Sequence, residues 1–169
     1  YEILLVLILM FVSLIGFIYA MRYFTAGVFQ ISQKKNNIAS LIAVLLIVQA
    51  FVYGYIYDFS ALCLTTLAFG FLARGKLVHY VILFPIVCLN KETSVLLIFV
   101  YWLHFHTMPD KRHFNRYLVI QVFSFVVIRG GLYWAFRDNL GGSFEFHLME
   151  HFTEYHRLFS KYPLLILYY

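Results

Sequence analysis

The residues of this sequence best suited to chemistry form a short polar stretch, Asn90-Lys91-Glu92-Thr93, between two apolar runs. Two opposite charges stand side by side in it. If the stretch lies within a membrane, each ion needs a partner, because an unpaired ion in an apolar interior is costly. We expect Glu92 to accept a hydrogen bond from Arg129, and Lys91 to hold a phosphate as a point charge. An ordinary structural turn is the alternative interpretation.

Arg129 and Asp58 are two further charged residues with candidate roles: Arg129 interrupts an apolar run and Asp58 ends one. Arg129 lies in Val126-Val127-Ile128-Arg129-Gly130-Gly131. A charge in such a run usually faces the interior of a helix bundle and pairs, and a guanidinium suits a diphosphate or a carboxylate. The alternative is that its side chain extends to the membrane surface. Asp58 is either a residue that caps a helix end or a carboxylate that binds a cation or acts as a base.

A stretch rich in histidine and glutamate follows, and His147-Leu148-Met149-Glu150-His151 matches the H-x-x-E-H string of one class of zinc peptidase. We interpret it instead as the polar side of an amphipathic helix over residues 143–161 that lies at the membrane interface. Apolar residues recur there at helical spacing: Phe144, Leu148, Phe152, Tyr155 and Phe159. No metal site is predicted from this string.

The composition indicates which elements must position these residues. Of 169 residues, 63% are hydrophobic and only 12% are charged. A soluble domain of this size cannot bury so much apolar surface, which excludes a soluble globular enzyme, a disordered chain, a disulfide scaffold and a DNA-binding module. The sequence therefore predicts an all-α, polytopic helical membrane bundle. The net charge of +5 fits basic loops that orient membrane helices.

Continuous apolar runs predict six membrane helices and the start of a seventh. The runs cover residues 3–21, 38–57, 59–73, 77–89, 93–108 and 117–136, and a further one begins at Pro163. The fourth and fifth runs are too short to cross about 30 Å of hydrocarbon. We expect broken or re-entrant helices there, which lower residues 90–92 into a protein-lined cavity. The chain begins and ends inside apolar runs, so we expect one transmembrane domain, 1–169, from a longer protein.

The distribution of Lys and Arg between alternate loops predicts the orientation. One set of loops holds eight basic residues: Arg22, Lys34, Lys35, Arg74, Lys76, Lys111, Arg112 and Arg116. The opposite set holds four: Lys91, Arg137, Arg157 and Lys161. Cytoplasmic loops carry the excess of positive charge, so the first set is predicted to be cytoplasmic. Asp58, residues 90–92 and residues 137–162 then face outward.

Four stretches together resemble a group of uncharacterised bacterial polytopic inner-membrane proteins. They are Tyr57-Asp58-Phe59, Ala73-Arg74-Gly75-Lys76, Cys88-Leu89-Asn90-Lys91-Glu92-Thr93-Ser94 and Glu145-Phe146-His147-Leu148. The group often has Asn-Arg-Glu-Thr in the third stretch, where this chain has Lys91, a change that weakens bidentate contact with phosphate. In layout the group is similar to the C-type glycosyltransferases, multi-span enzymes that take sugars from polyprenyl-phosphate donors at the outer face of the membrane.

The resemblance implies a membrane glycosyltransferase of polysaccharide biosynthesis in the bacterial inner membrane. In the C-type class the catalytic carboxylate typically lies in the first outer loop, and no residue here inherits that role. From their own positions, the candidate catalytic carboxylates are Asp58 and Glu92, and the candidate substrate-binding residues are Asn90, Lys91, Arg129, Glu145 and His147. The leaving phosphate is held either by an Arg, with no cofactor, or by a divalent cation, Mg²⁺ or Mn²⁺. Expected partners are membrane lipids, a polyprenyl-phosphate sugar and other membrane proteins, but no nucleic acid. The alternative is a non-catalytic membrane subunit or transporter whose buried charges are structural or line a conduction path.

Overall fold

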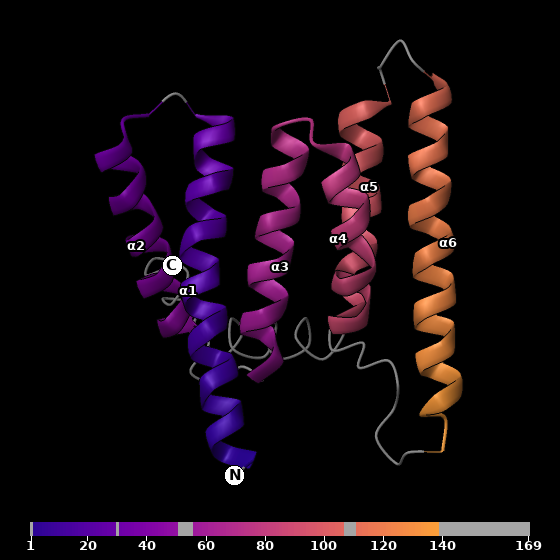
Figure 1. The fold of residues 1–169 in the computed structure, drawn as a ribbon, viewed down its shortest axis with the longest axis horizontal. Helices are drawn as coiled ribbons and strands as arrows, with labels where there is room; N and C mark the ends of the chain where they lie inside the picture. The colour runs from indigo at the N-terminus through magenta and orange to yellow at the C-terminus, as the bar shows by residue number, and fades with distance from the viewer. Residues whose placement is uncertain (1, 30, 51–55, 107–110, 139–169) are drawn as a thin grey trace, which may run out of the picture. The chain divides into compact units, whose positions relative to one another are not determined.

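The computed structural model describes residues 2–29, 31–50, 56–106 and 111–138, and every secondary-structure element in these ranges is helical (Figure 1). The all-α prediction is therefore confirmed for these ranges. The elements are α1 (Glu2–Val28), α2 (Gln33–Ala50), α3 (Ile56–Ala73), α4 (Leu77–Asn90), the 3₁₀ turn η2 (Glu92–Ser94), α5 (Val95–Phe105) and α6 (Lys111–Ala135). The chain divides into two compact units, Tyr1–Gly131 and Leu132–Tyr169, and the packing below concerns the first.

Two of the helices are long and apolar enough to cross a membrane. They cover Ile3–Val28, which has 26 residues, and Lys111–Ala135, which has 25. At about 1.5 Å per residue each rises close to 40 Å, more than the ~30 Å of a hydrocarbon core. Three further apolar helices, Asp58–Ala73, Leu77–Asn90 and Glu92–Phe105, are shorter. The total of six or seven spans stays a prediction.

Several helix ends lie beyond the boundaries that the sequence predicts. The first helix continues past Arg22 to Val28, the second begins at Gln33, and the last begins at Lys111. The predicted boundaries were wrong because they followed the charges, whereas Lys and Arg favour helix and can extend their charged ends away from apolar surface. The guanidinium carbon of Arg22, for example, lies 5.9 Å from the centroid of the Tyr19 ring, one turn earlier on α1.

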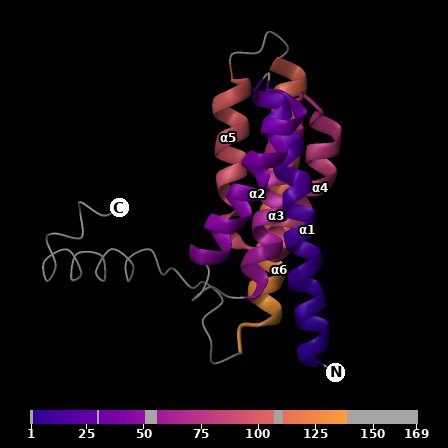
Figure 2. The same ribbon diagram turned by 90° about the vertical axis from the view of Figure 1, so that its left-hand side faces the viewer.

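The helices of the first unit alternate in direction, so their ends form two groups (Figures 1 and 2). The end of α1, the start of α2, the turn between α3 and α4, the end of α5 and the start of α6 lie together (Figure 1). We call this group of helix ends the basic end, because the eight basic residues predicted to be cytoplasmic lie on it or near it. The starts of α1 and α3 and the break between α4 and α5 lie in the opposite group (Figures 1 and 2).

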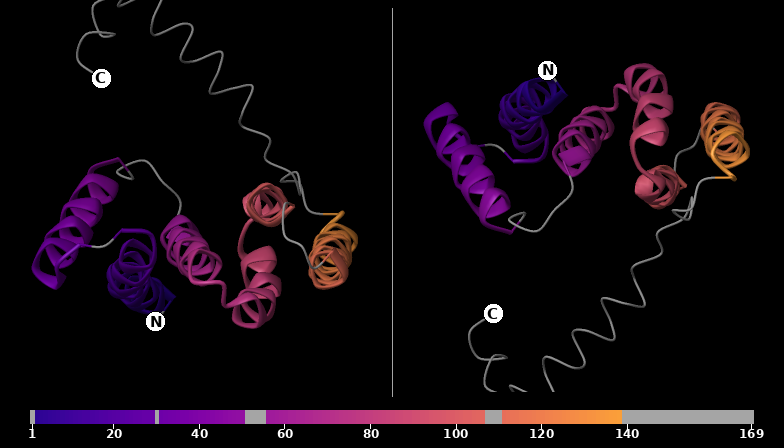
Figure 3. Two further views of the ribbon diagram at one scale, coloured as in Figure 1. Left: turned by 90° about the horizontal axis from the view of Figure 1, so that it is seen from above. Right: turned by 90° about the horizontal axis from the view of Figure 1, so that it is seen from below.

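Close approach of α1 and α3 depends on small residues. A Cβ atom on Gly16 would lie 2.8 Å from the Cys63 sulfur, and one on Gly70 would lie 2.6 Å from Cδ1 of Tyr23. Helices in a membrane have no hydrophobic driving force between them, and small residues at their interface let the two backbones approach closely. Viewed along the helices, α1 lies between α2 and α3 (Figure 3). The buried amide of Asn36 on α2 donates to the Arg22 carbonyl at 3.0 Å and so joins α2 to α1.

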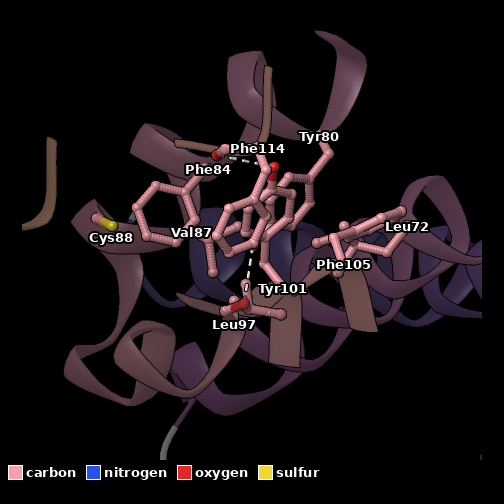
Figure 4. Close-up of a cluster of buried hydrophobic side chains, with 10 residues drawn as sticks. Leu72, Tyr80, Phe84, Val87, Cys88, Leu97, Tyr101, Phe105 and Phe114 are labelled. Atoms are coloured by element: carbon pink, nitrogen blue, oxygen red, sulfur yellow. Dashed lines mark hydrogen bonds between the residues drawn. The ribbon is translucent and has the colours of Figure 1, made fainter. Parts of the chain in front are cut away.

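An aromatic cluster joins α4, α5 and α6. The rings of Tyr80 and Tyr101 are stacked with centroids 6.0 Å apart, and those of Tyr101 and Phe114 are stacked at 5.6 Å (Figure 4). The hydroxyl of Tyr101 donates to the Phe114 carbonyl at 3.3 Å. Tyr80 and Tyr101 are fully buried and Phe114 nearly so. These rings fix the start of α6 against the two short helices.

The two short helices predicted around residues 90–92 are confirmed. Helix α4 has 14 residues and α5 has 11, so α4 rises only about 21 Å. Between them the backbone of Lys91 is extended, with φ −149° and ψ 144°, and η2 follows at once. The helix axis is thus broken at the polar stretch, which projects Lys91 and Glu92 toward different neighbours. The depth of this break in a membrane stays a prediction.

Candidate functional site

Glu92 and Arg129 form an ion pair, as the sequence predicts. An Nη2 hydrogen of Arg129 is donated to Oε2 of Glu92 at 2.5 Å. The side chains are 13% and 28% exposed for Arg129 and Glu92 respectively. Glu92 opens η2 directly after the break, and Arg129 lies in the C-terminal part of α6. The pair therefore joins two elements that are 37 residues apart in the sequence.

The same guanidinium also binds the end of α4. Nη1 of Arg129 donates to the Cys88 carbonyl at 3.3 Å. The last carbonyls of a helix have no amide partner within that helix, and they carry the negative end of its dipole. A cationic donor at this position satisfies both the hydrogen bond and the charge. Arg129 thus fixes the C-terminal turn of α4 and the first residue of η2 from one side chain.

Lys91 and Asp58 form a second ion pair, between Nζ and Oδ1. Asp58 is 8% exposed and lies in the first turn of α3. The apolar run over residues 38–57 predicts that Asp58 follows the end of a helix, but α3 already begins at Ile56 and includes Asp58. In this position the carboxylate also faces the positive end of the α3 dipole. Phosphate binding by Lys91 is untested and stays a prediction.

Asn90 adds a third contact between the break and α3. Its side-chain nitrogen donates to the hydroxyl oxygen of Ser60 at 2.7 Å. Its side-chain oxygen is buried and accepts no hydrogen bond within the described part of the chain. Ser60 was not predicted from the sequence, although a polar residue two positions after Asp58, at the start of an apolar run, was a signal for it. Asn90 and Lys91 together fasten the end of α4 to the start of α3.

We call Asp58, Lys91, Glu92 and Arg129 the four-charge cluster. Two carboxylates and two cations give it no formal net charge, and each carboxylate accepts a hydrogen bond from a cation. An ionised carboxylate can serve as a base, and a guanidinium or ammonium can bind a phosphate. Within the described ranges no group of three His, Cys, Asp or Glu side chains gathers to hold a metal ion. A divalent cation at this cluster stays a prediction.

Other predicted site residues lie where nothing is described. Glu145, His147 and the whole amphipathic helix predicted over residues 143–161 fall outside the described ranges. Their predicted roles in substrate binding and at the membrane interface remain predictions. The site that the structure builds thus consists of Asp58, Asn90, Lys91, Glu92 and Arg129.

Gln121 is a buried polar residue that was not predicted from the sequence. It is fully buried, its Oε1 lies 2.9 Å from the Tyr80 hydroxyl, and its Nε2 donates to the Tyr117 carbonyl at 3.1 Å. The Tyr80 hydroxyl also lies 3.0 Å from the Leu97 carbonyl of α5. An amide in the middle of an apolar run was the signal that could have revealed it. This network holds α4, α5 and α6 together, two turns of α6 away from Arg129.

Comparison with known proteins gives no match: no protein-family model, no curated protein and no solved structure matches this chain. A function of the four-charge cluster can therefore be inferred only from its own geometry and chemistry.

Proposed function

We propose that this chain is an integral membrane protein of the bacterial inner membrane, with six or seven helical spans, that transfers sugar from a polyprenyl-phosphate donor at the outer face. The observation that carries the proposal is the four-charge cluster, which gathers ionised side chains in a chain that is only 12% charged. Two helices long and apolar enough to span support membrane insertion. The basic end, opposite the cluster, supports the orientation.

The cluster suggests a division of roles in the transfer. An acceptor hydroxyl attacks the anomeric carbon of the sugar, and the bond from that carbon to the phosphate oxygen breaks. A carboxylate, Asp58 or Glu92, takes the proton of the hydroxyl. Arg129 and Lys91 bind the departing polyprenyl phosphate and stabilise its charge. The donor phosphate would replace a carboxylate as the partner of its cation, which leaves that carboxylate free to act as the base.

A second candidate function also has an observation in its favour. Each of the four charges already has a partner of opposite sign, so the cluster is satisfied without any ligand. A non-catalytic membrane subunit, or a transporter whose charges line a path, requires nothing more. In that case the two ion pairs serve to hold α3, the α4–α5 break and α6 together.

Sugar transfer by two variants separates these functions. We would measure transfer of labelled sugar from a panel of polyprenyl-phosphate-linked sugars in membrane vesicles that contain the wild type, Glu92→Gln or Arg129→Ala. Arg137→Ala is the matched control, because Arg137 is exposed. The enzyme proposal expects each cluster variant to lose at least a hundredfold in rate while remaining inserted. A wild type that transfers no sugar, with variants that are only less stable, would contradict the enzyme and favour the subunit.

A further inference from the structure

The basic end carries a strong segregation of charge. Seven of its basic side chains are exposed: Lys34, Lys35, Arg74, Lys76, Lys111, Arg112 and Arg116. The acidic residues of the first unit that the structure describes, Glu2, Asp58 and Glu92, all belong to other helix ends. Positive charge in the loops explains orientation, but an exposed cationic surface of this size also attracts anions.

One part of this surface is built around the ring of Tyr23. The guanidinium carbon of Arg74 lies 4.1 Å from the ring centroid, and the ammonium of Lys76 lies 5.7 Å from it. Nε and Nη2 of Arg74 both donate to the Tyr23 carbonyl, at 3.2 Å and 3.1 Å. The Tyr23 ring reaches this place because Gly70 has no side chain to block it. Two cations from one turn thus flank one aromatic ring.

The turn itself places the two cations. Gly75, between them, has φ +64°, and the amide nitrogens of Gly75 and Lys76 donate to the Leu72 and Phe71 carbonyls, which is the pattern of a Schellman turn. The turn reverses the chain within three residues, 74–76, so Arg74 and Lys76 are presented from a fixed backbone. A guanidinium has five N–H donors, so its two bonds to Tyr23 leave donors for an external acceptor.

Apolar surface adjoins these cations. Val78 and Ile82 follow Lys76 on α4, one turn apart, and are 55% and 67% exposed. Val28 and Phe29, at the end of α1, are also about half exposed. A ligand that fits both features has an anionic head and an aliphatic body. A nucleic acid or a free phosphate would use the cations alone.

We propose that the basic end binds the headgroups of anionic phospholipids, with Arg74 and Lys76 around Tyr23 as its most ordered site. This inference rests on the membrane insertion that the proposed function includes, but not on sugar transfer. Each Lys or Arg near an anionic lipid surface strengthens attraction by about fivefold. Removal of one cation from the Tyr23 site therefore lowers affinity for an anionic lipid by about that factor and leaves affinity for a zwitterionic lipid unchanged.

The test measures lipid bound to the full chain in detergent micelles, by native mass spectrometry, with phosphatidylglycerol or phosphatidylcholine added. We expect the wild type to retain phosphatidylglycerol preferentially, Arg74→Gln and Lys76→Gln each to lose that preference about fivefold, and Arg137→Gln to keep it. Lys76→Gln is included because Arg74→Gln also removes the hydrogen bonds to Tyr23 and can disturb folding.

Three results would overturn the lipid site: equal retention of the two lipids by the wild type, equal loss in Arg137→Gln, or complete displacement by millimolar inorganic phosphate or an oligonucleotide. Fractionation of cell membranes keeps the two proposals apart. If the chain is not recovered in the membrane fraction, the proposal that it is a membrane protein is contradicted. A chain that inserts but shows no preference for phosphatidylglycerol contradicts only the lipid site.

Discussion

Arg129 joins three elements, because this side chain of α6 donates hydrogen bonds both to Glu92 in η2 and to the last turn of α4. Loss of one partner from a buried ion pair leaves a charge with poor solvation and costs about 3–5 kcal/mol. The pair here is partly exposed, so solvent screening reduces the cost. The contribution of this ion pair to the free energy of unfolding therefore lies between that of a surface pair and that of a buried pair.

We predict that Arg129→Gln lowers the free energy of unfolding by about 1–3 kcal/mol. Glu92→Gln should cost less, because Arg129 keeps its bond to the Cys88 carbonyl. Together the two substitutions should cost less than the sum of the single ones, because the second removes the charge that the first leaves alone. Unfolding in mixed micelles measures the cycle. Strict additivity would contradict a direct interaction between the two side chains.

The two ion pairs differ in how far the sequence predicts them. The pairing of Glu92 with Arg129 could be predicted from the sequence, because a charge in an apolar run requires a partner and the chain has few residues of opposite charge. The pairing of Lys91 with Asp58 was not predicted, because both residues border apolar runs instead of interrupting one, and their partners depend on how the helices pack. Ser60 and Gln121 were not predicted for the same reason: their partners depend on how the helices pack, which is determined by the whole chain and not by the local sequence.

The helices themselves follow from the apolar runs, and the break in the fourth and fifth runs follows from their length. Their exact ends do not, because α1 and α6 extend through Arg22 and Lys111. At the end of α3 the decisive residue is Gly75, whose φ of +64° lies in the left-handed region. Other residues adopt this conformation at a cost of about 1–2 kcal/mol.

We predict that Gly75→Ala destabilises the protein by about 1 kcal/mol, because alanine is strained at the Schellman turn. Gly130→Ala is the matched control. Gly130 lies within α6, has no positive φ, and a Cβ added there meets no atom within 4 Å. Alanine at that position should be neutral or stabilise by up to about 1 kcal/mol. Melting temperatures of the two variants that shift in the same direction would contradict this account of the turn.

A second prediction at the level of elements concerns the contact of α1 with α3. A Cβ on Gly70 would lie 2.6 Å from a carbon of the Tyr23 ring, so Gly70→Ala forces the two helices or the ring to move. Overpacking of this kind costs about 1–3 kcal/mol. Gly131→Ala, where a Cβ meets nothing within 4 Å, is the control. Equal unfolding free energies of the two variants would mean that α1 and α3 are packed less closely than described.

At the scale of the molecule, the sequence and the structure agree on one asymmetry. The Lys and Arg residues that the loop rule assigns to the cytoplasm come from five separate helix ends, and the structure brings these ends together (Figures 1 and 2). The loop rule uses only the order of apolar runs along the chain, whereas the structure depends on packing. Their agreement supports the alternation of helix directions within residues 2–131, and it leaves the direction of insertion to be tested.

The predicted direction places the basic end in the cytoplasm and residues 137–162 outside. In a background of Cys63→Ser and Cys88→Ser, a membrane-impermeant maleimide should label Glu150→Cys in intact cells and Lys34→Cys only after permeabilisation. Lys34 suits this test because it is exposed at the start of α2, where the reagent can reach it. Labelling of position 150 only after permeabilisation would refute the orientation. Since an outward four-charge cluster is what a donor at the outer face requires, the same result would also contradict the proposed site of sugar transfer.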